Sequence, residues 1–217
     1  MPDFAARRET MVDTQVRPAD VTRYPIIAAM LAVAREHHVP PALREAAYAD
    51  QDLPVAAGRA LIAPRSFAKM LDALDLRPNE IVLDVGAGLG YGAAVLARLV
   101  DMVVAIEVDA GLAAEAERAL GADGVDAVAV ITGPLEAGAP RHGPYDAIVI
   151  EGAVEAMPEA LLGQLKDGGR IAAIFVDGPV GVCRIGVRAG DSIGWRDAFN
   201  ATAPVLPGFA KARSFAL

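Results

Sequence analysis

The chain has 217 residues, a formal net charge of −8 and no stretch rich in Lys or Arg, which argues against nucleic acid as a partner. Its apolar fraction of 54% supplies the core of one α/β domain with an appendage, but the length is short for two full domains. A single cysteine excludes an internal disulfide framework, and neither a signal core nor an apolar run of membrane-spanning length is evident. We therefore expect a soluble protein of the reducing, cytoplasmic compartment.

Residues 1–79 are expected to form a helical N-terminal extension. A cap and a proline in a first turn predict a helix that begins near residue 24 and is stopped by Val39-Pro40-Pro41. A short helix over residues 42–49 and a loop through residues 53–58 follow. Apolar residues then recur with a helical period from Pro64 to Leu74, which predicts a second long helix.

From residue 80 the pattern changes to alternating strands and helices, which is typical of a parallel sheet wrapped by right-handed crossovers. The expected strands are Ile81–Val85, Met102–Ile106, Ala127–Ile131, Ala147–Ile150 and Arg170–Phe175, and the expected helices are Tyr91–Val100, Gly111–Leu120 and Pro158–Leu165. Residues 180–187 and 192–199 predict a closing hairpin. The predicted fold class is α/β: a Rossmann-like, doubly wound sheet over residues 80–217 that ends in antiparallel strands. A ligand would bind beyond the carboxyl ends of the parallel strands.

The most informative segment is the glycine-dense turn after the first of these strands. Asp84 precedes the run Gly86-Ala87-Gly88-Leu89-Gly90, and Glu107 ends the next strand. Glycine lets the backbone adopt positive φ and approach a ligand closely, and the helix opening near Tyr91 would present free N–H groups. Glu107 can accept both hydroxyl hydrogens of a ribose. This βαβ unit therefore predicts an adenosine-containing cofactor.

The spacing within the turn favours one such cofactor. A dinucleotide fingerprint is Gly-x-Gly-x-x-Gly, whereas the third glycine here comes one residue early, at Gly90. An acid inside the turn, Asp84, would repel a pyrophosphate but could hold the ammonium of a methionine moiety. S-adenosylmethionine is therefore favoured over a nicotinamide dinucleotide, and a tight turn without a ligand is the remaining alternative.

Several segments are also colinear with a known family. They are residues 11–17, 29–30, 33–40, 47–50, 53–54, 82–91, 144–149 and 161–170. In these runs the chain resembles the protein-L-isoaspartate O-methyltransferases, S-adenosylmethionine enzymes that esterify the carboxylate of damaged isoaspartyl sites. The resemblance implies isoaspartyl-containing proteins or peptides as substrate and a function in protein repair. It also implies opening helices over residues 11–17 and a first long helix that ends at Val39-Pro40.

Two departures from the family pattern concern the acceptor and the adenine. The family carries Thr-Ile-Ser-x-Pro at its acceptor site, but here Ala60 replaces the threonine and Ile62 the serine, so neither can donate a hydrogen bond. After the third strand the family has Gly-Asp-Gly, whereas this chain has Thr-Gly-Pro-Leu-Glu. Leu135 could still pack against an adenine face, and Glu136 could reach its amino group.

The catalytic residues are not identified by the sequence. With Ile62 in place of the serine, the nearest groups that could orient an acceptor are Arg65 and Ser66, and a guanidinium can clamp a carboxylate through two hydrogen bonds. A solvated surface arginine is the alternative for Arg65. An isoaspartyl carboxylate is already ionised at neutral pH, so the reaction needs positioning more than a general base. Glu151, at the end of the fourth strand, could face either a ligand or water.

The leading hypothesis is an S-adenosylmethionine-dependent methyltransferase of the isoaspartyl-repair type. A second keeps the cofactor and changes the acceptor to a small molecule or another carboxylate. A third is a non-catalytic adenosyl-binding homologue, and a nicotinamide-dependent oxidoreductase is the last. No metal site is expected, because His37 and His38 would point in different directions from one helix. The sequence leaves the oligomeric state open.

Overall fold

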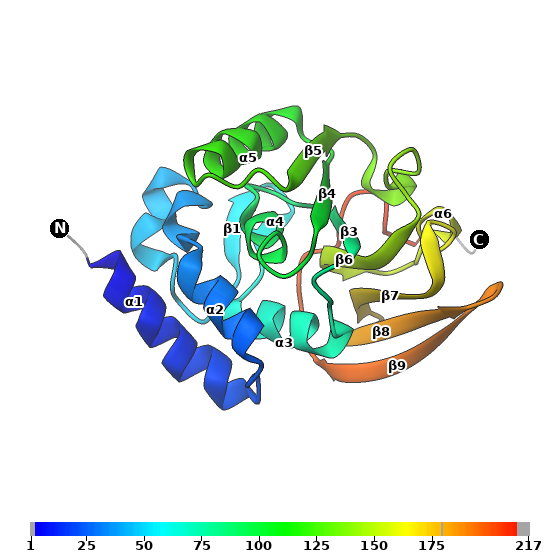
Figure 1. Cartoon of the computed structure of the whole chain (residues 1–217), viewed down its shortest axis with the longest axis horizontal. Helices are drawn as coiled ribbons and strands as arrows, with labels where there is room; N and C mark the ends of the chain where they lie inside the picture. Colours follow the sequence, from blue (N-terminus) through cyan, green and yellow to red (C-terminus); the bar gives the residue numbers. More distant parts are fainter. Residues whose placement is uncertain (1–2, 179, 212–217) are drawn as a thin grey trace, which may run out of the picture.

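The computed structural model describes residues 3–178 and 180–211, and at its centre lies one large β-sheet. Its strands are β3 (Ile81–Val85), β4 (Met102–Glu107), β5 (Val128–Thr132), β6 (Tyr145–Val154), β7 (Leu165–Val176), β8 (Gly181–Ala189) and β9 (Ser192–Asn200). The strand order is β5-β4-β3-β6-β7-β8-β9 (Figure 1). Neighbours from β5 to β7 pair in parallel, and β8 and β9 continue the sheet as an antiparallel hairpin. The predicted Rossmann-like sheet with an antiparallel finish is confirmed.

Helices connect the parallel strands and form the N-terminal part of the chain. They are α1 (Phe4–Met11), α2 (Tyr24–Ala32), α3 (Pro64–Leu74), α4 (Tyr91–Leu96), α5 (Ala110–Ala122) and α6 (Glu159–Leu162). Shorter helical turns are η1 (Val12–Val16), η2 (Arg17–Ala19), η3 (Arg35–His37), η4 (Pro41–Ala46) and η5 (Leu135–Ala137). The predicted bounds of α3 are confirmed, because Pro64 fits its first turn and Asp75, in the left-handed region, ends it.

Each face of the sheet is covered by a different layer. Side chains of α1 to α4 form one buried cluster with residues such as Val82 and Val103 on the first face. On the second face, Leu83 and Ile148 pack with η5, α6 and the C-terminal residues Leu206 and Phe209. The N-terminal helices thus share one hydrophobic core with the sheet. The second layer is thinner, since α6 has only four residues.

Four predictions for individual segments differ from the structure. The helix expected to run to Val39 ends at Ala32, because Arg35 and His38 are drawn into the interior by hydrogen bonds to distant carbonyl groups. The loop predicted through residues 53–58 is instead the first strand and turn of a hairpin, β1 (Leu53–Ala56) and β2 (Arg59–Leu61). The helices expected over 91–100 and 158–165 are shorter than predicted, as α4 and α6 show.

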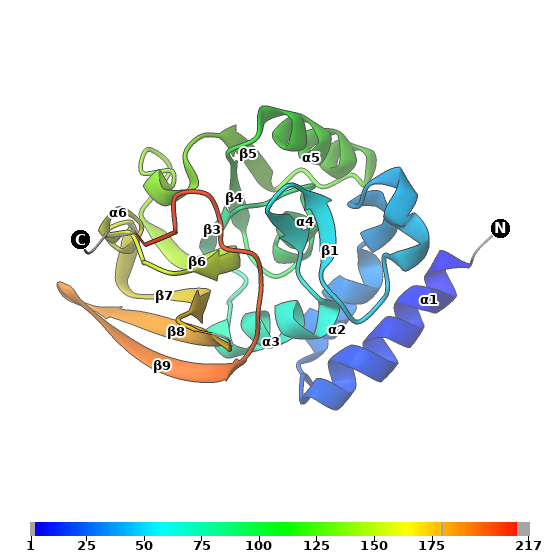
Figure 2. The same ribbon diagram turned by 180° about the vertical axis from the view of Figure 1, so that it is seen from behind.

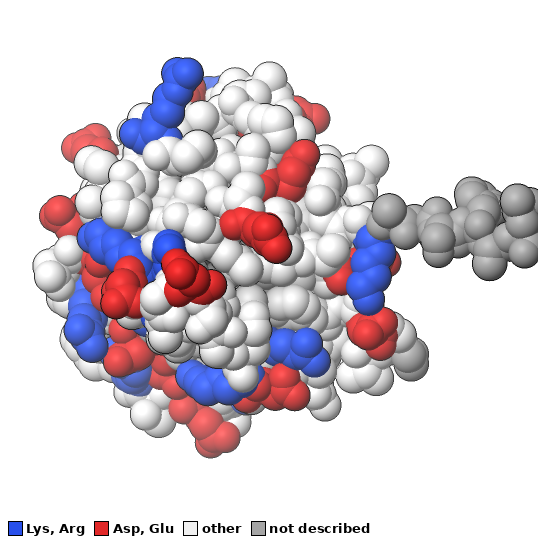
Figure 3. Space-filling view, turned by 90° about the vertical axis from the view of Figure 1, so that its right-hand side faces the viewer, with Lys and Arg blue, Asp and Glu red and all other residues white. Residues whose placement is uncertain are grey.

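The surface carries charges of both signs. On the face shown in Figure 3, acidic and basic side chains are interspersed, and no continuous basic patch is visible. Among the described residues, no helix is both long and apolar enough to cross a membrane.

Candidate functional site

The glycine turn lies where β3 gives way to α4, at the carboxyl edge of the sheet. As predicted, Gly86, Gly88 and Gly90 adopt positive φ angles of 83°, 56° and 85°. The N–H of Gly86 donates to the carbonyl of Ile106 over 2.9 Å, which ties the turn to β4. Nδ1 of the buried His38 lies 2.8 Å from the carbonyl oxygen of Leu89 and, since a carbonyl only accepts, is the donor.

Glu107, the last residue of β4, is fully buried beside this turn. Its Oε2 accepts the N–H of Gly88 over 2.8 Å, and its Oε1 accepts those of Val108 and Asp109 over 2.9 and 3.1 Å. The acid predicted to bind a ribose therefore lies against the glycine turn. Three backbone amides hold it there.

A residue that the sequence did not single out also binds Glu107. Arg59, at the start of β2, is 5% exposed and donates from Nη1 to Oε1 over 2.7 Å and from Nη2 to Oε2 over 2.8 Å. Nη2 also lies 2.8 Å from the carbonyl oxygen of Gly86. Buried ion pairs of this kind are strongly destabilised when one partner is removed. The Ala57-Gly58 turn between two short strands is the one sequence signal that could have located this hairpin.

Two further acids, Asp84 and Glu151, form a buried pair next to the turn. Neither oxygen of Asp84, nor Oε1 of Glu151, accepts a hydrogen bond from an N–H or hydroxyl group of the described residues, and the two carboxyl groups interact with each other. Burial raises the pKa of Asp84 to about 7, and repulsion from Glu107 adds to this rise. Burial also raises the pKa of Glu151, with repulsion from Asp84 as a further cause. The possibility that Glu151 faces water is therefore wrong, since it is only 4% exposed.

Gly92, in the first turn of α4, makes room for this acid pair. A Cβ at position 92 would overlap the carboxyl group of Glu151, so any side chain there would force the acid or the helix to move. α4 has only six residues. The unpartnered acid oxygens, rather than the end of this short helix, are the polar groups that suit a cationic ligand.

The C-terminal residues 203–211 cover the same edge of the sheet. Figure 2 shows this segment, in red, crossing in front of β3 and β6. The amide of Ala153 donates to Pro204 and the amide of Leu206 donates to Ala153, over 2.9 and 3.0 Å, so the segment follows the end of β6. A Cβ at Gly86 would lie 3.1 Å from a methyl group of Leu206. Leu206 and Arg59 therefore lie together over the first glycine of the turn.

The residues predicted to contact an adenine lie beneath this segment. Leu135 is fully buried in the second core, within η5. The carboxyl group of Glu136 stands next to Gly208, where it leaves no room for a side chain.

The predicted acceptor residues are separated by the fold. The side chain of Ile62 is 1% exposed within the first core, and its carbonyl accepts a hydrogen bond from Nη2 of Arg35 over 2.7 Å. Arg65 is 55% exposed and forms an ion pair with Asp50 at 3.3 Å, so the description of a solvated surface arginine fits it. Arg65 and Ser66 line an open hollow of about 470 Å³, together with Ala63, Lys69, Phe199, Asn200, Ala201 and Thr202.

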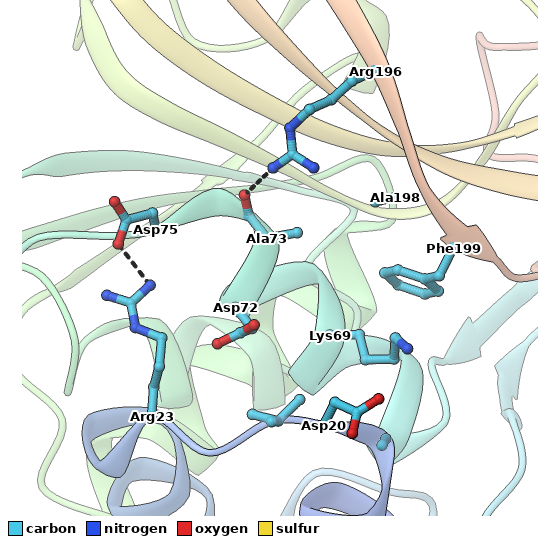
Figure 4. Close-up of a pocket in the computed structure, with 11 residues that line it drawn as sticks. Asp20, Arg23, Lys69, Asp72, Ala73, Asp75, Arg196, Ala198 and Phe199 are labelled. Carbon is cyan, nitrogen blue, oxygen red and sulfur yellow. Dashed lines mark hydrogen bonds and ion pairs between the residues drawn. The ribbon is translucent and has the colours of Figure 1, made fainter.

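A second hollow of about 450 Å³ adjoins the first through Lys69 and Phe199 (Figure 4). Both arginines that line it are held by neighbouring groups. Arg23 bridges to Asp75 over 2.7 Å, and Arg196 donates to the carbonyl of Ala73 over 2.9 Å. Neither Glu107 nor Asp84 lines either hollow.

The comparisons with known proteins identify the family. Residues 6–181 match the family described as protein-L-isoaspartate(D-aspartate) O-methyltransferase. The chain belongs to this family. A protein-L-isoaspartate O-methyltransferase of Methylorubrum extorquens is 43% identical over 181 residues, which are 83% of this chain and 78% of the relative. The protein of the same name from Herpetosiphon aurantiacus is 42% identical over 171 residues, or 79% and 76% of the two chains.

Solved structures agree with the fold of the family. A structure named protein-L-isoaspartate O-methyltransferase superimposes with a TM-score of 0.81 at 23% identity and covers 93% of this chain and 66% of its own. A Plasmodium falciparum structure named for the same activity, in complex with S-adenosyl-L-homocysteine, gives a TM-score of 0.79 at 18% identity, covering 95% and 99% of the two chains. The resemblance noted in the sequence is thus confirmed at the level of family and fold.

The structure also places two adjacent histidines, the cysteine and two aromatic residues. His37 and His38 both face Asp123, at 2.7 and 3.3 Å, so the prediction that they point in different directions from one helix is wrong. No cluster of three metal-binding side chains occurs among residues 3–178 and 180–211. Cys183 is buried in β8. Tyr24 and Trp195 are 77% and 37% exposed, so neither lies in the core.

Proposed function

We propose that this chain transfers a methyl group from S-adenosylmethionine to the side-chain carboxylate of L-isoaspartyl residues in damaged proteins, as a repair enzyme. Membership of the family supports the reaction. The single observation that carries the cofactor assignment is the buried Glu107 held against the three positive-φ glycines at the end of the parallel strands. The lone buried cysteine and the bacterial relatives support a cytoplasmic location.

The acids and glycines of the site are of the kinds that an adenosyl cofactor requires. A buried carboxylate oxygen without a hydrogen-bond donor destabilises the folded protein unless a ligand supplies the donor, and Asp84 has two oxygens of this kind. Glu107 would accept the hydroxyl groups of the ribose, and Asp84 would hold the ammonium group of the methionine moiety. Gly86, Gly88 and Gly90 would let the cofactor approach the backbone. When bound, the cofactor supplies an electrophilic methyl group.

The remaining task of the protein is to orient the acceptor. An isoaspartyl carboxylate is anionic at neutral pH, so no group has to remove a proton from it. Alignment alone can contribute up to about 7–11 kcal/mol to such a reaction. We place the acceptor peptide in the hollow beside Arg65 and Ser66, where Lys69 adds a second cation. The cations there would attract the carboxylate by charge, without the hydroxyl groups that positions 60 and 62 lack.

A second candidate is methyl transfer to a different acceptor, and one observation favours it. The side chain at position 62 is apolar and buried, so the segment that resembles the family's acceptor motif offers no side-chain hydrogen bond there. A small molecule or another protein carboxylate would then take the place of the isoaspartyl group. A non-catalytic adenosyl-binding protein is the third possibility.

The test is release of S-adenosylhomocysteine with an isoaspartyl peptide, run beside its aspartyl twin and a blank without peptide. Calorimetry of S-adenosylhomocysteine with the same protein separates binding from turnover. Turnover on the isoaspartyl peptide alone supports repair. Binding of S-adenosylhomocysteine without turnover on either peptide would indicate a different acceptor. No binding of S-adenosylhomocysteine would refute the cofactor assignment.

A further inference from the structure

We propose that Arg59 occupies the ribose subsite through its bridge to Glu107 and must withdraw from this acid for an adenosyl ligand to bind. The inference rests on the proposed function, because it takes Glu107 to be the ribose-binding acid. It adds a residue from the hairpin β1–β2 that regulates entry to this site.

The first argument is that Glu107 has no acceptor capacity to spare. A carboxylate offers about four lone-pair positions. Its two oxygens already accept three backbone N–H groups and two N–H groups of Arg59, at distances of 2.7 to 3.1 Å. The backbone donors are fixed by the turn and by the end of β4. Hydroxyl groups of a ribose can therefore bind Glu107 only if the guanidinium withdraws.

The second argument is the position of the guanidinium over the turn. Nη2 lies 3.2 Å from where a Cβ of Gly86 would stand and bonds to the carbonyl of the same residue. The space that glycine leaves free at position 86, which a cofactor would use, is thus taken by Arg59 and by Leu206. Asp84, Gly86, Gly88 and Glu107 are all buried in this arrangement.

The third argument is that the hairpin can release Arg59 without disturbing the large sheet. Strands β1 and β2 pair only with each other, as a separate two-stranded sheet. The turn at Gly58 is open, since no atom lies within 4 Å of a Cβ built there. Directly after β2 the chain is anchored again, by Arg35 at the carbonyl of Ile62 and by Asp52 at the amide of Ala63. The Nε atom of Arg59 has no partner among the described residues, so not every donor of the guanidinium is satisfied.

Displacement has a measurable consequence. The apparent affinity of a ligand is its affinity for the open form multiplied by the fraction of protein in that form, so a guanidinium that holds the site closed weakens cofactor binding. Removing a side chain from a binding site ordinarily weakens binding. Loss of Arg59 should have the opposite effect and strengthen the binding of the cofactor.

The experiment is calorimetric titration of S-adenosylhomocysteine into the wild-type protein, Arg59→Gln and Arg59→Lys. We expect Arg59→Gln to bind about tenfold or more tightly than the wild type, since no closed form then competes. Arg59→Lys should fall between them, because an ammonium cannot hold both carboxylate oxygens as a fork. If Arg59→Gln fails to fold, the lysine variant decides by the same measurement.

Arg170→Gln is the matched control. Arg170 forms an equivalent two-point bridge to Glu80, at 2.7 and 2.9 Å, and is only 16% exposed, but Glu80 precedes β3 at the opposite edge of the sheet. Its loss should lower stability without tightening the binding of the ligand. If the wild type binds S-adenosylhomocysteine as tightly as the folded Arg59 variants, or more tightly, this inference is overturned. Either result would leave the proposed function intact. No binding by any folded variant would overturn both.

Discussion

Replacing Ile62 by serine tests whether this position can serve as an acceptor contact. The side chain is 1% exposed and packs within the first core, so the substitution removes a buried apolar group and buries a hydroxyl group in its place. Large-to-small changes of this kind cost about 2–5 kcal/mol, and a poorly paired hydroxyl adds about 1 kcal/mol or more. We therefore expect Ile62→Ser to lower the free energy of unfolding by about 3–6 kcal/mol in total.

Thermal unfolding and isoaspartyl turnover of the same preparation provide the assay. A loss of this size lowers the melting temperature of a chain of this length by about 10–20 °C. Ile62→Val is the matched control and should cost about 1 kcal/mol, because it deletes one methylene group and adds no polar atom. Turnover should not rise in Ile62→Ser. A variant with the wild-type melting temperature and a gain in isoaspartyl turnover would refute the core position and restore residue 62 as an acceptor contact.

Three further changes follow from buried groups elsewhere. Asp84→Asn should have a higher melting temperature than the wild type, and the difference should widen from pH 5 to pH 8. The pKa of Asp84 is about 7 in the folded protein and about 4 in the unfolded chain, so the wild type loses stability as the pH rises from about 4 to about 7. Equal margins at both pH values would contradict the raised pKa. Leu206→Ala should cost about 2–5 kcal/mol in urea unfolding, because Leu206 is 2% exposed in the second core. Burial raises the pKa of the Cys183 thiol to about 12, so an aromatic disulfide reagent should react about a hundredfold more slowly with native than with urea-unfolded protein.

The sequence predicted the elements whose signals are local. The strand Ile81–Val85 has the predicted bounds because an apolar run ends there in glycines, and α3 because Pro64 begins it. The segment 33–40 was mistaken for a helix because its buried polar residues are stabilised from far away in the chain. Arg35 donates to the carbonyl groups of Ala47 and Ile62, which no local pattern predicts.

The same difference between local and distant signals separates the site residues that the sequence predicted from those that it did not. Glu107 and the glycines were predicted because strand, turn and acid follow one another at a fixed spacing. Arg59 was not, because 48 positions separate it from Glu107 and its neighbours in sequence are unremarkable small and apolar residues. The pairing of Asp84 with Glu151 likewise depends on two strands that are adjacent in the sheet but distant in the chain.

The C-terminal cover has a consequence for how the chain is made. Leu206 and Phe209 seal the second face of the sheet, and the amides of Glu155 and Ala156 donate to the carbonyl of Phe209. All seven strands of the sheet precede these residues in the chain. A ribosome that has just released β9 therefore presents a sheet whose second face is covered only in part, by η5 and α6. Until residues 203–211 emerge, the uncovered part of that face is accessible to chaperones and to other nascent chains, and Leu206 does not yet cover the glycine turn.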